Sequence, residues 1–217
     1  MTRPPAAERP RRTYQDEARR IAARSIVGLE RTSVTPDALT VAGVSTCILA
    51  AAVVWLEYLS EWLFLVGAAL FVVGSVLDIL DGALARRTGK GTPFGAFLDS
   101  TVDRVGEGFM LGAIGLVLMR AGNEWGVALA FAAMAGSFLV SYARARAEAI
   151  GLRGDVGIGS RAERVVVITS GLVLAPLHEL ILPSTMALLT ATAWVTVVQR
   201  VLAVRAQLRG LPPEPNS

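Results

Sequence analysis

The stretch DILDGALARRTGKGTPFGAFLDSTVD, residues 78–103, places two pairs of aspartates beside two long apolar runs. Asp78 and Asp81 are three residues apart, a spacing that puts both on one face of a helix. Asp99 and Asp103, four residues apart, share a helix face in the same way. Two adjacent helices joined by the short polar connection between the pairs would bring these faces together. The stretch therefore predicts two neighbouring helices with an acidic cluster between them.

The composition of the whole chain indicates a membrane protein. Hydrophobic residues make up 53% of the 217 residues, only 18% are charged, and the mean hydropathy is +0.53. Adding the 21 glycines brings the apolar share to roughly 63%, against about 45–50% in soluble domains. A soluble domain, a disordered chain and an extended nucleic-acid-binding surface are all disfavoured, and the net charge of +3 is too small to argue for nucleic acid. The single cysteine, Cys47, excludes an intramolecular disulfide and lies in an apolar run.

Hydropathy predicts an all-α polytopic protein with six transmembrane helices. A hydrocarbon core of about 30 Å requires about 20 predominantly apolar residues per helix. The predicted spans are 38–56, 62–85, 97–119, 125–147, 163–182 and 184–204. The boundary between the last two is placed around Pro183.

The positions of the basic residues predict the orientation. Of the 21 Lys and Arg residues, 19 lie before the first span or in 86–90, 144–164 and 200–209. These segments alternate with connections that are mostly acidic. Under the positive-inside rule, both termini and the connection that follows Asp81 are cytoplasmic.

The N-terminal region is expected to lie on the membrane surface. Residues 1–20 hold six arginines without an apolar core, so they do not form a cleaved signal peptide. Apolar residues at helical spacing predict an amphipathic interfacial helix over 14–31, with a disordered basic arm as the alternative. Residues 1–12 and 211–217 are expected to be disordered tails that flank a membrane domain at 13–210.

The acidic cluster predicts a divalent metal site. Converging carboxylates at the edge of a low-dielectric medium repel one another, and neither of the two spans contains a lysine. Ligands that are all oxygen favour Mg²⁺ or Mn²⁺, or Ca²⁺, over softer metals. Mg²⁺ commonly binds carboxylates together with substrate phosphates, so the substrate should carry phosphate. Gly82 would let such a substrate approach the backbone, and Arg86, one turn further on, could bind its phosphate.

The pattern Asp-x2-Asp-Gly-x2-Ala-Arg-x8-Gly-x3-Asp-x3-Asp in residues 78–103 resembles the signature of the CDP-alcohol phosphotransferases. This family has six membrane helices and transfers a substituted phosphate from a CDP-alcohol to the hydroxyl of a second alcohol, releasing CMP. The resemblance implies two ions, Mg²⁺ or Mn²⁺, and a general base at Asp103. The implied metal ligands are Asp78, Asp81, Asp99 and Asp103.

The resemblance also implies which residues bind the donor. Gly82, Arg86 and Thr92 occupy the family's positions that contact the CDP group. The segment TPDALT, residues 35–40, is similar to a family segment in which the positions of Asp37 and Thr40 border the nucleotide. Without the main signature, this segment could equally be a helix start with its threonine packed inward.

The acceptor is implied by a second resemblance. SYARARAEAIGLRGD (141–155) and SRAERVVV (160–167) are similar to the branch of the family in actinobacteria that joins CDP-diacylglycerol to 1L-myo-inositol 1-phosphate. The residues at the inositol phosphate positions are Arg144, Arg146, Arg164 and Arg200. Arginine forks suit phosphate, although lysine is common at the first of these positions in that branch. The same arginines could instead determine topology at the lipid headgroups.

Alternatives remain open from the sequence. Arginines do not distinguish inositol phosphate from glycerol 3-phosphate, so a phosphatidylglycerophosphate synthase is the second reading. A cation-coupled transporter would also place aspartates in membrane helices, although near the midplane. Gly108 and Gly112 permit close helix approach within the chain or between chains, and the family resemblance implies a homodimer.

Overall fold

The computed structural model describes residues 35–210. The predicted amphipathic helix at 14–31 and the tails at 1–12 and 211–217 lie outside this range. Between residues 35 and 210 all the regular secondary structure is helical and there is no strand, which confirms the all-α prediction. The α-helices are α2 (Pro36–Trp55), α3 (Trp62–Thr88), α4 (Pro93–Arg120), α5 (Glu124–Ala149), α6 (Arg161–Leu174) and α7 (Ile181–Gly210).

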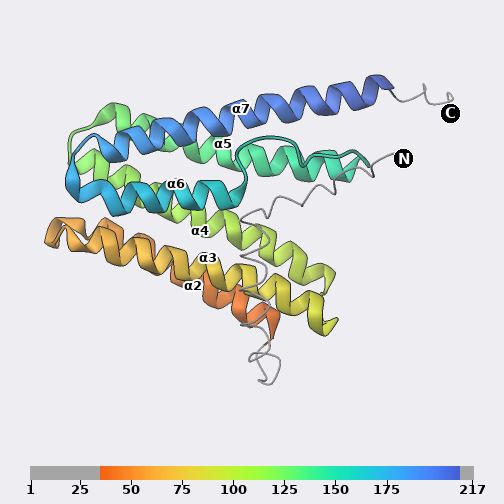
Figure 1. Ribbon diagram of the computed structural model, residues 1–217, viewed down its shortest axis with the longest axis horizontal. Coiled ribbons are helices and arrows are strands. Elements are labelled where there is room, and N and C mark those ends of the chain that lie inside the picture. The colour runs from red at the N-terminus through yellow and green to blue at the C-terminus, as the bar shows by residue number, and fades with distance from the viewer. Residues whose placement is uncertain (1–34, 211–217) are drawn as a thin grey trace, which may run out of the picture.

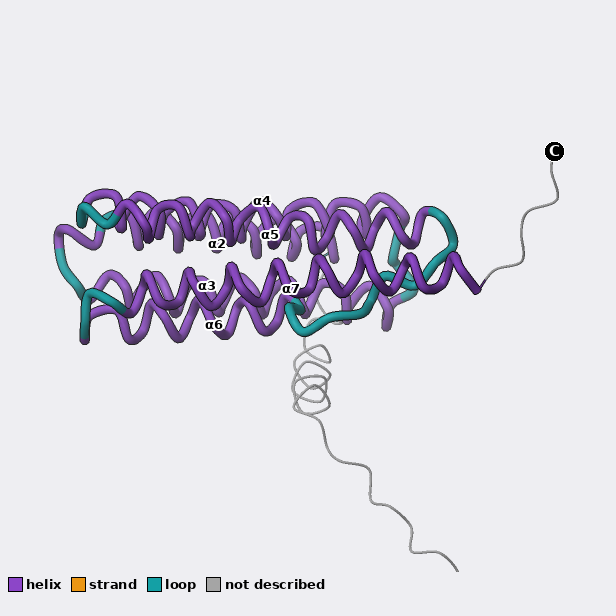
Figure 2. The backbone as a smooth tube through the Cα atoms, turned by 90° about the horizontal axis from the view of Figure 1, so that it is seen from above, coloured by secondary structure: helices purple, strands orange, loops and turns teal. Residues whose placement is uncertain are grey.

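The six described helices run side by side in two layers, seen from the side in Figure 1 and from above in Figure 2. One layer contains α2, α4 and α5, and the other contains α3, α6 and α7. Contacts of α2 with α3, and of α5 with α7, join the layers. The helices thus form a closed ring in the order α2, α3, α6, α7, α5 and α4. Although α3 and α4 follow one another in sequence, α2 packs against both of them.

Several helices begin where a side chain caps the free backbone amides. The Thr35 hydroxyl accepts from the Ala38 amide at 3.2 Å, and the Thr92 hydroxyl accepts from the Gly95 amide at 2.9 Å. Proline follows both threonines, at a position where its missing N–H costs nothing. Ser160 begins α6 with a reciprocal capping box.

Four of the helices, α2, α3, α5 and α7, are long and apolar enough to cross a membrane. The helix α4 has 28 residues but carries the charged site, and α6 has only 14 residues. The predicted spans other than 163–182 each lie largely within one of the described helices. The predicted boundary at Pro183 is wrong, because α6 ends at Leu174 and Pro183 lies in the first turn of α7. Proline is tolerated in the first turn of a helix, so Pro183 does not interrupt α7. The chain instead leaves α6 at the 3₁₀ turn that contains Pro176.

The apolar core fills the end of the helix bundle that lies away from the aspartates. Its largest buried side chains come from α2, α3, α4, α6 and α7, and include Phe71, Ile114 and Met186. At the crossing of α2 and α3, a Cβ on Gly74 would lie 2.6 Å from Cys47 Sγ and 2.8 Å from the Gly43 carbonyl. Glycine is required there for close backbone approach. Cys47 is buried in this core, as its apolar setting predicts.

Candidate active site

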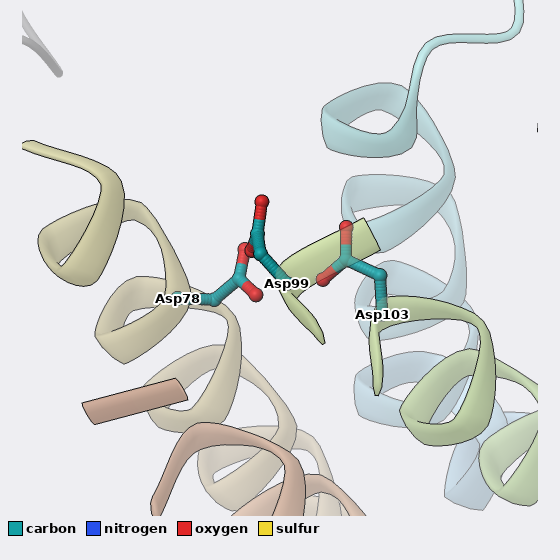
Figure 3. Close-up of side chains that lie close together, drawn as sticks. All are labelled: Asp78, Asp99 and Asp103. Atoms are coloured by element: carbon teal, nitrogen blue, oxygen red, sulfur yellow. The ribbon is translucent and has the colours of Figure 1, made fainter. Parts of the chain in front are cut away.

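Three of the four predicted metal-binding aspartates lie together between α3 and α4 (Figure 3). Asp78 comes from α3, and Asp99 and Asp103 come from α4. One carboxylate oxygen from each lies within 4.8 Å of the other two. Asp103 is 9% exposed, so its charge is largely removed from water. The predicted convergence of the two helix faces is confirmed for these three residues.

Asp81 lies apart from this cluster and faces α2. It is 2% exposed, and the Thr40 hydroxyl donates a hydrogen bond to its Oδ2. Its Oδ1 has no hydrogen-bond partner among residues 35–210. A buried carboxylate oxygen without a donor is costly unless a cation or another ligand satisfies it. Asp81 therefore retains the capacity to bind a ligand.

A cavity of about 270 Å³ opens beside Asp81 and Asp99. All five residues predicted to bind the donor line it: Asp37, Thr40, Gly82, Arg86 and Thr92. Two glycines shape the wall. A Cβ on Gly82 would lie 3.3 Å from the Arg86 guanidinium, and one on Gly95 would lie 3.1 Å from Asp37 Oδ1. The sequence segment at 35–40 thus serves both as a helix start and as one wall of the cavity.

Arg161, the first residue of α6, reaches into the aspartate cluster. Its guanidinium forms an ion pair with Asp78 and lies 2.7 Å from Asp103 Oδ1. The side chain is 27% exposed. Sequence reasoning placed Arg161 beside Arg164 without assigning it a role. The structure therefore adds a cation from α6 to the predicted site.

Arg164 is buried, and each of its three side-chain nitrogens donates a hydrogen bond. It is 3% exposed, and its Nε and Nη2 donate to the two carboxylate oxygens of Glu107 at 2.6 Å and 2.9 Å. Its Nη1 donates to the Gly159 carbonyl at 2.8 Å. Glu107, four residues after Asp103, was also missed by sequence reasoning. The signal was present in the sequence, because an acid within an apolar helix requires a partner.

Two of the other predicted acceptor arginines, Arg144 and Arg200, lie at the loop at 151–160. Arg200 is 7% exposed and donates to the carbonyls of Val140 and Val156. The backbone of Arg144 lies against Gly154, because a Cβ on Gly154 would lie 2.9 Å from the Arg144 Cα. The Arg144 side chain pairs with Glu148 at 2.8 Å. Arg146 is exposed. The structure brings Arg144, Arg164 and Arg200 to one loop.

The carboxylate oxygens of the cluster are suitable ligands for a hard divalent cation. The three clustered residues offer carboxylate oxygens alone, and the nearby Asp81 Oδ1 is unsatisfied within the described residues. Oxygen ligands of this kind suit Mg²⁺ or Mn²⁺. Arg104 adds a cation whose guanidinium lies 3.8 Å from Asp103 and donates to the Ser141 hydroxyl at 2.5 Å.

The fold and this acidic site define a helical membrane enzyme of known class. The chain belongs to the CDP-alcohol phosphatidyltransferase family, whose model matches residues 33–202. The resemblance read from residues 78–103 is thereby confirmed, and the protein is a CDP-alcohol phosphotransferase.

Individual relatives narrow the comparison. A phosphatidylinositol phosphate synthase of Mycobacteroides abscessus is 38% identical over 200 residues, covering 87% of this chain and 86% of that protein. An archaetidylinositol phosphate synthase of Methanothermobacter thermautotrophicus is 39% identical over 134 residues, covering 61% of this chain and 66% of that protein.

Solved structures show the same fold. The phosphatidylinositol phosphate synthase of Mycobacterium tuberculosis with CDP-DAG bound is 31% identical and superposes with a TM-score of 0.76, covering 85% of this chain and 94% of that chain. Its complex with manganese and citrate superposes with a TM-score of 0.72, covering 87% of this chain and 88% of that chain.

Proposed function

We propose that this enzyme transfers the phosphatidyl group of CDP-diacylglycerol to a hydroxyl of 1L-myo-inositol 1-phosphate, giving phosphatidylinositol phosphate and CMP. The observation that carries the proposal is the cavity lined by the five predicted donor-binding residues, beside the cluster of Asp78, Asp99 and Asp103. The relatives named as phosphatidylinositol phosphate synthases, and the neighbour with CDP-DAG bound, support this choice of substrates.

Each side of the cavity has a part in donor binding. Asp78, Asp81, Asp99 and Asp103 would hold two Mg²⁺ or Mn²⁺ ions, and the neighbour with manganese bound supports a metal here. The bound cations would neutralise charge on the pyrophosphate and stabilise the leaving group. Gly82 and Arg86 form one wall, on which the guanidinium can bind a phosphate oxygen. Asp37, Thr40 and Thr92 also line the cavity and would orient the nucleotide.

The reaction is a displacement at the phosphorus atom of the phosphatidyl group. The acceptor hydroxyl forms the new O–P bond, and its proton passes to the Asp103 carboxylate. The P–O bond to CMP breaks, and CMP leaves with its electron pair. The cluster lies inside the ring, with Asp103 only 9% exposed, so bulk water competes poorly with the acceptor.

The acceptor would bind where α5, α6 and α7 meet the loop at 151–160. Arg144 and Arg146, on α5, are exposed. The Arg144 Nε donates to Glu148 at 2.8 Å, so a phosphate would bind at its terminal nitrogens. Arg200 anchors the loop through Val156 and contributes positive charge to the same region. Arg164 would join them as a phosphate ligand or hold the loop through Gly159.

Radiolabelled acceptors test the substrate assignment directly. Purified protein is incubated with CDP-diacylglycerol, Mg²⁺ and either inositol 1-phosphate or glycerol 3-phosphate, and both lipid product and CMP are measured. The proposal expects both products with inositol 1-phosphate and their loss with EDTA. Lipid product from glycerol 3-phosphate alone would contradict the proposed acceptor.

We also propose six membrane crossings, with both termini and the active site in the cytoplasm, from the six-helix ring and the distribution of the basic residues. α6 is the decisive element because of its short length. In a Cys47→Ala background, Arg153→Cys and Glu179→Cys flank α6. Labelling of intact cells with an impermeant thiol reagent should modify only the second. Equal labelling of both would contradict a sixth crossing.

A homodimer is part of the same proposal and rests on the family resemblance. Within the described chain, Gly108 already serves packing in the monomer, since a Cβ there would lie 3.1 Å from Phe138. Gly108 and Gly112 also line an apolar groove of about 710 Å³ between α2, α4 and α5, which a second copy would cover. A monomeric mass for fully active detergent-purified protein would contradict the dimer.

A further inference from the structure

Arg161 contacts the same carboxylates that are expected to bind metal. Its two terminal nitrogens reach two different helices, with Nη1 on Asp78 of α3 and Nη2 2.7 Å from Asp103 of α4. The two carboxylates are 13% and 9% exposed. A single guanidinium therefore bridges two buried charges across the centre of the ring.

A cation that is held at two carboxylates competes with any other cation for them. Asp78 and Asp103 have little space left for a further ligand, because both are largely buried and a carboxylate oxygen of Asp99 lies within 4.8 Å. A guanidinium and two divalent ions would therefore compete for the same four oxygens of Asp78 and Asp103. Mutual repulsion between the cations further opposes simultaneous binding in a site with little water.

We propose that Arg161 and the metal ions exchange at Asp78 and Asp103. The guanidinium leaves the two carboxylates as the ions bind, and it then pairs with a phosphate of the bound substrates. A partly buried guanidinium that loses its carboxylates needs another anion, and phosphate is the anion that the reaction supplies. This inference rests on the proposed function, since it assumes that the cluster binds divalent ions and that the substrates carry phosphate.

The local structure is built to hold Arg161 at this point. Ser160 caps α6 through the Glu163 amide, and the Ser160 amide donates to Glu163 at 2.7 Å, so the helix start is fixed. One turn further on, the buried Arg164 anchors α6 to Glu107. The backbone is thus fixed on both sides of Arg161, and exchange requires only a rotation of its side chain.

Metal binding without substrate tests the exchange directly. Mn²⁺ is titrated into purified full-length protein, and the free ion is measured by electron paramagnetic resonance. Arg161→Gln should bind Mn²⁺ about tenfold more tightly than the wild type because the competing cation is gone. With Mn²⁺ saturating, the same variant should show a lower kcat/KM for CMP release, because the contact to phosphate is lost. Arg161→Lys retains a charge that cannot bridge both carboxylates, and should show a smaller gain in affinity.

Arg104→Gln is the matched control for charge. It removes one positive charge beside Asp103, but Arg104 lies 3.8 Å away and donates to Ser141 instead of bridging the cluster. It should tighten Mn²⁺ binding much less than Arg161→Gln. Equal gains in the two variants would overturn the exchange, and so would unchanged affinity in both Arg161 variants.

The two proposals fail in different ways. Saturable Mn²⁺ binding that is identical in wild type and Arg161→Gln overturns the exchange and leaves the enzyme assignment intact. Tighter binding in Arg161→Gln, in a protein that releases no CMP with inositol 1-phosphate, supports the exchange and overturns the proposed acceptor. An absence of saturable Mn²⁺ binding in every variant overturns the exchange together with the metal site.

Discussion

The site has two sides that differ in how completely their buried charged groups are hydrogen-bonded. The carboxylate side consists of Thr40, Asp78, Asp81, Asp99 and Asp103, on α2, α3 and α4. The arginine side consists of Arg164, Arg200 and Glu107 around the loop at 151–160. On the carboxylate side an oxygen of Asp81 lacks a donor among the described residues. On the arginine side every Arg164 nitrogen donates to Glu107 or Gly159.

This difference separates residues that bind ligands from residues that stabilise the fold. Unsatisfied buried oxygens are destabilising in isolation, so they mark a place where a ligand completes the structure. A buried arginine whose three nitrogens all donate within the protein stabilises the arrangement of the chain and has fewer N–H groups left for a substrate. The expected effects of substitutions on the two sides differ accordingly: loss of turnover on the first, and loss of stability on the second.

Asp103→Asn should have the largest effect on turnover. The amide cannot accept the acceptor's proton, so we expect CMP release to fall by about 10²- to 10⁴-fold. Binding of CDP, measured by calorimetry, should remain, because Asp37, Thr40 and Arg86 are unchanged. Glu124→Gln, at the opposite end of the bundle, is the control and should keep wild-type turnover. Normal turnover in Asp103→Asn would show that Asp103 is not the base.

Glu107→Gln should have the largest effect on stability. The change leaves the buried Arg164 without its counter-charge, at a cost of about 3 kcal/mol. For a chain of this length such a loss lowers the thermal midpoint by roughly 6–12 °C. The purified protein is followed by thermal unfolding in detergent. A double variant, Glu107→Leu with Arg164→Met, should recover most of the loss, since an apolar pair of similar volume replaces the ion pair.

The double variant also decides what Arg164 does. If Arg164 only supports the loop at Gly159, the stable double variant keeps a normal KM for the phosphorylated acceptor. A raised KM in a protein of recovered stability would assign Arg164 to acceptor binding. An unchanged thermal midpoint in Glu107→Gln would contradict the contrast between the two sides.

The carboxylate side could be predicted from the sequence because its information is local. Residues 78–103 contain all three clustered aspartates, and the segment at 35–40 completes the cavity. The arginine side depends on contacts between distant segments, such as Glu107 with Arg164 and Arg200 with Val156. Spacing along one helix cannot show that Arg161 faces the cluster while Arg164 turns to Glu107. The end of α6 was misplaced because hydropathy continues through Pro176.

Thr40→Val should have a smaller effect, confined to the donor. Valine keeps the volume but removes the hydroxyl that donates to Asp81, which leaves both carboxylate oxygens without a donor among the described residues. A lost hydrogen bond of about 1 kcal/mol corresponds to roughly a fivefold rise in the KM for CDP-diacylglycerol. Thr46→Val is the matched control, because that hydroxyl donates only to Ala42 of its own helix. A similar rise in both variants would remove the special role of Thr40.

Ser160→Ala should have the smallest effect. It changes the start of α6, the helix that carries both Arg161 and Arg164. Ser160 caps α6, and losing its accepting oxygen costs about 1 kcal/mol of stability, a fall of roughly 2–4 °C in the thermal midpoint. Ser160→Thr retains the cap and should unfold like the wild type. Because the cap also fixes the backbone of Arg161, the alanine variant should bind Mn²⁺ slightly more tightly than the wild type. A loss of stability without any change in metal affinity would mean that Arg164 and Glu107 alone are sufficient to hold Arg161 at the carboxylates.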